Sequence, residues 1–157
     1  FKLEQKITDE KHRIAMVSCV AAEYENVEVS TLEIDGPKVS YTYETMKKIQ
    51  EKRPEDELYL IMGSDSLLAL ESWYMGEELL RDFSFILAPR PGYDSTKTKE
   101  KKNAVKKKYG TEIRVLHNKL RDISSTEIKE TIKAGKEIGH LVPTKVAEYI
   151  HEHGLYL

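Results

Sequence analysis

Three hydroxyl side chains, Ser124, Ser125 and Thr126, stand in a row before a segment whose apolar residues have helical spacing. Ser124, with Glu127 three residues later, matches the pattern of a capping box. One hydroxyl is enough for a cap, so the other two are surplus to helix initiation. Surplus hydroxyls beside backbone N–H groups, at the positive end of a helix dipole, suit a phosphate. Taken alone, this motif favours the cap, so the choice depends on the rest of the chain.

Two other polar stretches follow apolar segments with strand character. Residues 57–62 are followed by Gly63, which permits close backbone approach, and by Asp65. Asp65 is able to accept a hydrogen bond from a ribose hydroxyl or to cap the next helix, and this motif alone favours the cap. Residues 83–88 are followed by Arg90, which stands between two prolines and would be held in a rigid turn. Such a cation is a candidate for contact with a phosphate or a base.

The elements that must position these residues alternate along the chain. Helical spacing is expected over residues 8–24, 42–52, 66–74, 76–83 and 97–110, and strand character over residues 27–34, 57–62, 83–88 and 112–117. Thr8 is the expected N-cap of the first helix, and the last helix is expected to begin with Pro143 and to end at Gly154. This alternation is typical of an α/β fold whose mostly parallel sheet has helices on both faces. Ligands bind such sheets beyond the carboxyl ends of the strands, where the three polar stretches are expected.

Composition limits the class of protein. A chain of 157 residues, 39% hydrophobic and 33% charged, predicts one domain over residues 1–157 with its own core, without repeat or linker. No apolar run approaches the roughly 20 residues that span a bilayer. The single cysteine, Cys19, lies in an apolar helical pattern, which favours a small buried residue in a reducing compartment, and hence the cytoplasm. A net charge of −2 gives no overall attraction to nucleic acid or membrane.

For the lysine-rich segment and the histidines, the sequence favours structural or solvent-facing roles over binding sites. The lysine-rich segment after residue 96 is expected to be a solvated helix face and not a nucleic-acid surface, because Tyr109 is the only aromatic residue near it. Its lysines are Lys97, Lys99, Lys101, Lys102, Lys106, Lys107 and Lys108. The five histidines have no convincing metal-ligand spacing, so no metal site is predicted among them.

The motifs together resemble the bacterial nicotinate-nucleotide adenylyltransferases of the nucleotidyltransferase superfamily. They are GPKVSYTYETM at 36–46, GSDSLLALESWY at 63–74, RPGY at 90–93, ISSTEIK at 123–129 and HLVPTKVAEYIHEHGLY at 140–156. The resemblance covers essentially the whole chain. It implies a Rossmann-like fold and adenylyl transfer from ATP to nicotinate mononucleotide, giving the deamido dinucleotide and pyrophosphate in NAD biosynthesis. It also implies Mg²⁺ carried on the ATP phosphates and small-molecule partners, while the oligomeric state, a homo-oligomer included, is left open.

The same resemblance assigns substrate-binding residues. The pyridine pocket would be formed by Thr42, Trp73 and Tyr74, although a lone tryptophan after such a helix is otherwise more often a core residue. Lys129 stands where the family usually has arginine, so the charge is kept but the two-donor fork of arginine is lost. The residues implied for ATP are Gly63 and Asp65 near the ribose, Arg90 near the adenine, and Ser124, Ser125, Thr126 and Lys129 around the phosphates.

One family motif has no counterpart here. The family's catalytic histidines lie in a GxFDPxHxGH stretch after the first strand, and nothing in this sequence matches it. The resemblance therefore assigns no catalytic residue within residues 1–157. We expect the intact protein to begin roughly 45 residues earlier, with two further strands in the centre of the sheet, between residues 27–34 and 57–62.

Two alternatives stay open. One is a nucleotide-binding or regulatory module that kept the fold without the chemistry. The other is a related adenylyltransferase with a different acceptor, pantetheine phosphate or nicotinamide mononucleotide, against which the SYT and SWY stretches count.

Overall fold

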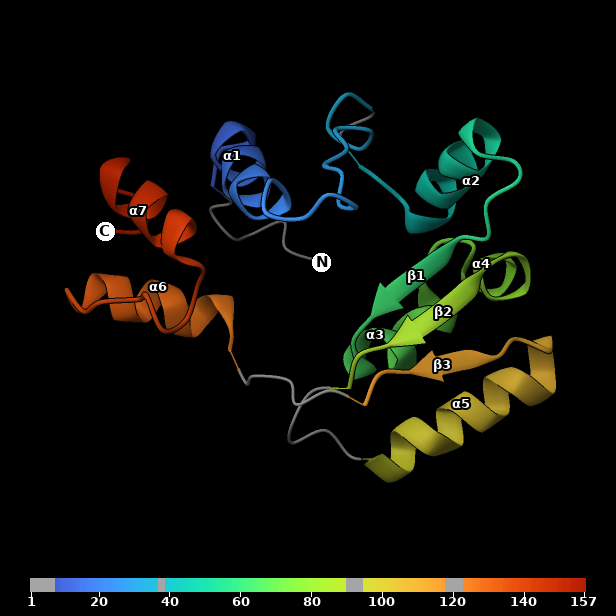
Figure 1. The fold of residues 1–157 in the computed structure, drawn as a ribbon. Helices are drawn as coiled ribbons and strands as arrows, with labels where there is room; N and C mark the ends of the chain where they lie inside the picture. The colour runs from blue at the N-terminus through green and yellow to red at the C-terminus, as the bar shows by residue number, and fades with distance from the viewer. Residues whose placement is uncertain (1–7, 37–38, 90–94, 118–122) are drawn as a thin grey trace. The chain divides into compact units, whose positions relative to one another are not determined.

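The computed structural model describes residues 8–36, 39–89, 95–117 and 123–157. They form two compact units, which we call the middle unit, Gly36–Asp122, and the terminal unit, Phe1–Asp35 with Ile123–Leu157 (Figure 1). The middle unit contains α2 (Thr42–Lys52), β1 (Tyr59–Met62), α3 (Ser64–Ala69), η1 (Leu70–Ser72), α4 (Gly76–Asp82), β2 (Ser84–Leu87), α5 (Ser95–Tyr109) and β3 (Ile113–Val115). The terminal unit contains α1 (Glu10–Ala21), α6 (Ser125–Lys133) and α7 (Thr144–Glu152).

A parallel sheet forms the base of the middle unit. Its strands have the order β1-β2-β3, and Leu60, Phe85 and Ile113 align across them. Since aligned residues point to the same face of a sheet, these side chains share one face with Met62, Leu87 and Val115. All of them lie in the hydrophobic core of the unit or pack against it.

Helices α2 to α5 pack on this face. Leu67 of α3 and Leu79 and Leu80 of α4 are completely buried, and Met46 of α2 and Val105 of α5 join the same core. On the other face of β1, Ile61 is 64% exposed. The core therefore fixes α3 and α4, the two helices on either side of residues 70–75.

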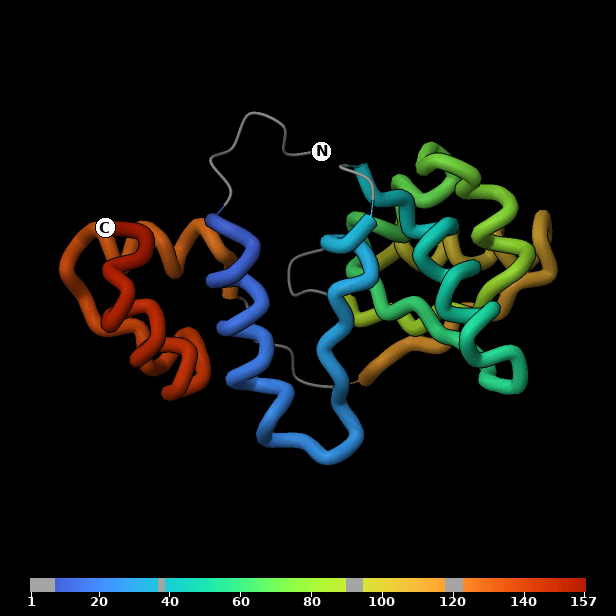
Figure 2. The backbone as a smooth tube through the Cα atoms, turned by 90° about the horizontal axis from the view of Figure 1, so that it is seen from above, coloured from blue at the N-terminus to red at the C-terminus, as the bar shows by residue number. Residues whose placement is uncertain are grey.

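The terminal unit consists of segments from the two ends of the chain. Helix α1 packs against α7, and Figure 2 shows the blue and red segments of this unit side by side. Its core consists of Ile132, Ile138, Val146 and Ile150, with Cys19 of α1 partly buried against it. The expectation of a buried Cys19 is thus met in part, because the side chain is of intermediate exposure.

The structure corrects several expected elements. Residues 27–34 form no strand, and β1 pairs only with β2 among the described residues. Alternating side chains predict which way residues would point, but a strand also requires a hydrogen-bonding partner. The N-cap of α1 is Asp9, whose side chain accepts from the Lys11 N–H, and not Thr8. Pro143 is the N-cap of α7 and not its first helical residue, and the helix ends at Glu152, before Gly154.

Other expectations are confirmed. Helix α2 spans Thr42–Lys52, as the apolar spacing and the following Pro54 predict. Helix α5 is followed by Gly110, whose φ of +76° is typical of a glycine that ends a helix. Most side chains of α5 are exposed, as expected of a solvated face. No helix among the described residues is both long and apolar enough to span a membrane. That both units form one nucleotidyltransferase domain stays a prediction.

Candidate functional site

The carboxyl ends of the three strands in the middle unit lie side by side. The Ala88 N–H donates to the Met62 carbonyl (2.8 Å), and the Leu116 N–H donates to the Leu87 carbonyl (2.9 Å). The parallel ladder thus continues one residue beyond β2 and one residue beyond β3. It brings the segments after β1, β2 and β3 to one edge of the sheet, as the alternating pattern predicts. Arg90 lies outside the described residues, so its assignment stays a prediction.

Asp65 does not cap the helix that follows β1. Gly63 is the N-cap of α3, and no side-chain hydrogen bond caps this helix. Asp65 is already the second helical residue, where its carboxylate is exposed to solvent. A Cβ on Gly63 would lie 2.6 Å from Asp65 Oδ1, so the glycine lets the carboxylate lie close to the backbone. The favoured capping interpretation is therefore wrong, and the carboxylate is available to a ligand.

The start of α2 and the turn after η1 come together through two aromatic rings. Tyr41, the N-cap of α2, has its ring centroid 4.3 Å from that of Tyr74, with 32° between the ring planes. Thr42, the first residue of α2, thus directly follows Tyr41, whose ring contacts Tyr74. Trp73 is half-buried and packs against the core. The two segments predicted to form the pyridine pocket thus meet, through Tyr41, which the sequence analysis did not assign to the pocket.

Hydrogen bonding also anchors α2 against α4. The Tyr43 hydroxyl donates to Asp82 Oδ2 (2.9 Å), which raises the pKa of the tyrosine. The Tyr43 ring makes an edge contact with Phe83, at 6.2 Å between centroids. These contacts hold the helix whose first residue is Thr42.

Helix α6 begins with the predicted capping box. Ser124 Oγ accepts from the Glu127 N–H (3.1 Å), and the Ser124 N–H donates to Glu127 Oε2 (3.5 Å). Ser125 and Thr126 are exposed and take no part in the cap. Lys129, one turn further on, has its Nζ 5.4 Å from the centroid of the Tyr156 ring. The cap is confirmed. The hydroxyls of Ser125 and Thr126, beside the helix start, are exposed to solvent.

The residues predicted to bind ATP belong to both units. Gly63 and Asp65 lie in the middle unit, whereas residues 124–129 lie in the terminal unit. The convergence of these residues on one ligand therefore stays a prediction.

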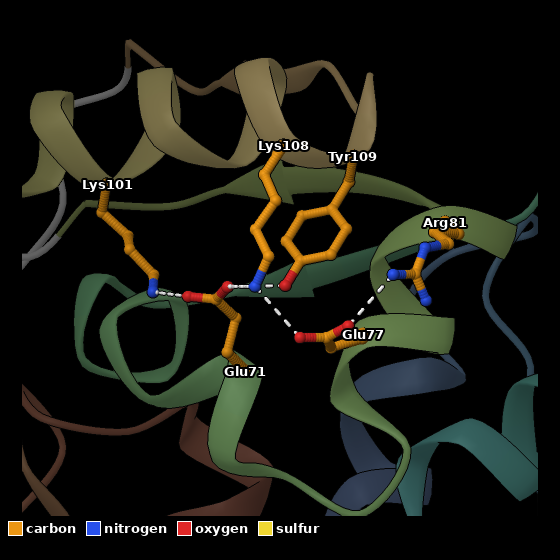
Figure 3. A network of polar contacts seen from close by, with 6 residues as sticks. All are labelled: Glu71, Glu77, Arg81, Lys101, Lys108 and Tyr109. Atoms are coloured by element: carbon orange, nitrogen blue, oxygen red, sulfur yellow. Dashed lines mark hydrogen bonds and ion pairs between the residues drawn. The ribbon is translucent and has the colours of Figure 1, made fainter.

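A carboxylate just before Trp73 has three hydrogen-bond donors. Tyr109 Oη donates to Glu71 Oε1 (2.6 Å), Lys108 Nζ donates to the same oxygen (3.1 Å), and Lys101 Nζ donates to Oε2 (Figure 3). Donation by Lys101, Tyr109 and Lys108 lowers the pKa of Glu71 to about 2. Lys101 is only 20% exposed, so it is not part of a solvated lysine face.

Two histidines, His12 and His153, lie within hydrogen-bonding distance of Tyr149. His12 Nδ1 lies 3.0 Å from the Tyr149 hydroxyl, and His153 Nδ1 lies 3.0 Å from the Tyr149 carbonyl oxygen. Where the structure describes the chain, no group of three or more His, Cys, Asp or Glu side chains could hold a metal ion.

Known proteins match almost the entire chain. Residues 1–131 match the family model described as cytidylyltransferase-like. A Thermoanaerobacter sp. (strain X514) protein named "probable nicotinate-nucleotide adenylyltransferase" is 36% identical over 156 residues, which cover 99% of this chain and 74% of that protein. The chain belongs to the nicotinate-nucleotide adenylyltransferase family. A member of the same name from Clostridium botulinum (strain Kyoto / Type A2) is 35% identical over 99% of this chain and 78% of its own length.

Solved structures of nicotinic acid mononucleotide adenylyltransferase share the fold. The Plasmodium falciparum enzyme complexed with NaAD superposes with a TM-score of 0.72 at 19% identity, over 99% of this chain and 78% of that one. Its complex with APC gives a TM-score of 0.71 at 20% identity, over 97% of this chain and 78% of that one. The family resemblance and the Rossmann-like α/β fold predicted from the sequence are both confirmed.

Proposed function

We propose that this protein transfers the adenylyl group of ATP to nicotinate mononucleotide, a step of NAD biosynthesis. One observation carries the proposal: a relative of that name is 36% identical over 156 residues, which cover 99% of this chain. The two mononucleotide-side segments that meet through Tyr41 and Tyr74 support it.

The reaction joins two phosphates without redox chemistry. A phosphate oxygen of the mononucleotide attacks the α-phosphorus of ATP, a new phosphorus–oxygen bond forms, and the bond to the bridging oxygen of pyrophosphate breaks. Pyrophosphate leaves with the electron pair of that bond. The protein contributes mainly by positioning both substrates and by stabilising negative charge on the transferring group.

On the ATP side, the start of α6 supplies donors for phosphate oxygens. The first turn of a helix has backbone N–H groups without intrahelical partners, and the Ser124 cap uses that of Glu127. The N–H groups and hydroxyls of Ser125 and Thr126, with the Lys129 ammonium, would then hold the phosphates. Gly63 and Asp65 would hold the ribose, the carboxylate accepting from its hydroxyls, and Arg90 would lie near the adenine.

On the acceptor side, Trp73 offers a ring to stack on the pyridine, and Thr42 a hydroxyl beside it. The Tyr41–Tyr74 contact would close this pocket at its outer side. Stacking on aromatic rings is tolerant of the substituent, so Thr42 and the turn geometry would distinguish a carboxylate from an amide.

A divalent cation accompanies ATP in nucleotidyl transfer, and we propose Mg²⁺. The ion would be bound through the phosphates of ATP. When bound, the ion neutralises charge on the phosphates. The substrates are small molecules of the cytoplasm, and the proposal requires neither nucleic acid nor membrane.

The test is an activity assay of the full-length protein encoded by the gene for this chain. ATP, Mg²⁺ and nicotinate mononucleotide should give nicotinate adenine dinucleotide and pyrophosphate, both detected by chromatography. Nicotinamide mononucleotide and pantetheine phosphate serve as competing acceptors. Preference for either competitor would mean that the protein is an adenylyltransferase with a different acceptor. Binding of both substrates without formation of any product would favour the non-catalytic module.

A further inference from the structure

The turn that carries Trp73 and Tyr74 has a tightly defined backbone. The Trp73 N–H donates to the Leu70 carbonyl (3.1 Å), and the Gly76 N–H donates to the Trp73 carbonyl (2.9 Å). Met75 between them is left-handed, with φ of +50°. A Cβ on Gly76 would overlap the Leu70 carbonyl oxygen, so only glycine lets α4 begin this close to η1.

Side chains of α5 hold this turn from both sides. Glu71, two residues before Trp73, receives hydrogen bonds from Lys101, Lys108 and Tyr109. Lys108 and Tyr109 follow Lys101 by seven and eight residues, about two helical turns, so all three side chains can reach the same carboxylate from α5. Figure 3 shows them directed towards the Glu71 carboxylate.

The second attachment lies after the turn. Lys108 Nζ also donates to Glu77 Oε1 (3.0 Å), and Arg81 Nη2 donates to Glu77 Oε2 (3.0 Å). Arg81 lies over the Tyr109 ring, 5.2 Å from its centroid. Lys108 therefore links a carboxylate before the turn to a carboxylate after it (Figure 3).

We propose that the Glu71–Lys101–Lys108–Tyr109 cluster positions Trp73 for the acceptor mononucleotide, with Glu71 as the positioning residue. This inference rests on the proposed function, in which Trp73 stacks on the pyridine. The core holds only part of the tryptophan ring, since Trp73 is half-buried. The orientation of its exposed part depends on η1, which is fixed to α5 through Glu71.

The test compares Glu71→Gln with wild type in this chain. Calorimetry should show a dissociation constant for nicotinate mononucleotide raised about tenfold, and that for ATP unchanged. Trp73 is the only tryptophan, so its fluorescence reports the turn directly, and acrylamide should quench it more strongly in the variant. Tyr109→Phe, which removes one neutral donor and is a milder change, should raise the mononucleotide constant about two- to threefold.

Lys106→Gln is the matched control. Lys106 lies on the same helix as the three donors and pairs with Glu112, just before β3 (3.3 Å). Both side chains are well exposed, at 61% and 74%. It should leave both binding and quenching unchanged. Equal quenching in Glu71→Gln and wild type overturns the inference, even if the wild type binds no mononucleotide. The proposed function is tested separately, by product formation with the complete gene product. Weaker binding of both substrates in parallel would also overturn it, because the cluster would then act only on overall stability.

Discussion

Trp73 connects the core to the exposed surface of the turn after η1. Its partial burial agrees in part with the core role that the sequence pattern alone favours, while the ring of its neighbour Tyr74 lies tilted against that of Tyr41. A residue in this position can serve the core with one side of its ring and a ligand with the other.

Trp73→Ala should weaken binding of nicotinate mononucleotide by about 1 to 3 kcal/mol, the usual range for stacking of a base on an aromatic ring. ATP binding should change little. Calorimetry with each nucleotide measures both. Tyr24→Ala, which removes a 56% exposed aromatic ring from the terminal unit, should alter neither. Unchanged mononucleotide affinity in Trp73→Ala would remove this residue from the pocket.

The stabilising effect of Glu71 should depend on pH. Its pKa lies at about 2 instead of its ordinary 4.5, so the carboxylate stabilises the fold above about pH 4.5, and this contribution is lost as the pH falls towards 2. Because the side chain is 33% exposed, we expect Glu71→Gln to cost only about 1 kcal/mol at pH 7. Urea unfolding from pH 7 to pH 3 checks this. A difference between variant and wild type that stays constant over this range would contradict it.

What the sequence reveals about single residues depends on the distance to their partners. Ser124 and Glu127 are three residues apart, so their capping box could be predicted. Glu71 binds residues 30 to 38 positions away, and Tyr41 stacks on a ring 33 positions away. No local spacing rule detects such pairs, which is why the lysine-rich helix looked entirely solvated.

At the scale of the element, the start of α6 distinguishes a cap from a phosphate site. Ser124→Ala should lower the free energy of unfolding by about 1 kcal/mol, because it leaves the Glu127 N–H without its acceptor. Ser125→Ala and Thr126→Val should cost little stability but weaken ATP binding. Lys129→Ala should raise the dissociation constant for ATP and leave that for the mononucleotide nearly unchanged, whereas Lys129→Arg should be tolerated or bind better. Titration calorimetry and thermal unfolding measure the series.

Lys133→Ala, in the last turn of the same helix, is the control for a loss of charge and should leave ATP binding unchanged. Equal ATP affinity in all variants, with only Ser124→Ala less stable, would mean that this stretch caps a helix and does nothing more.

The boundaries of helices and strands can likewise be predicted only where local residues determine them. The bounds of α2 follow from local signals, its apolar spacing and the nearby Pro54. Residues 27–34 have the alternation of a strand but no paired neighbour in the structure, and Val27 is 50% exposed. Whether such a segment becomes a strand is decided by the rest of the sheet, which a local pattern does not contain.

At the scale of the whole molecule, the middle unit is continuous in sequence and has its own core. We therefore expect a fragment of residues 36–122 to fold by itself, with cooperative urea unfolding and protected amides in β2. A fragment of residues 1–35 should remain unfolded, because Ile132, Ile138, Val146 and Ile150, which form the core of its unit, are absent from it. Circular dichroism and hydrogen exchange measure both. An unfolded 36–122 fragment would contradict the expectation.

The terminal unit also imposes an order of events on the ribosome. Helix α1 is synthesised more than 120 residues before its partner α7. At about 5 to 20 residues per second, this delay lasts on the order of ten seconds. During that time the middle unit can complete its core, while α1 still lacks α7, the helix against which it packs. The nascent chain should therefore be exposed to chaperones and proteases through α1 until α7 has been made.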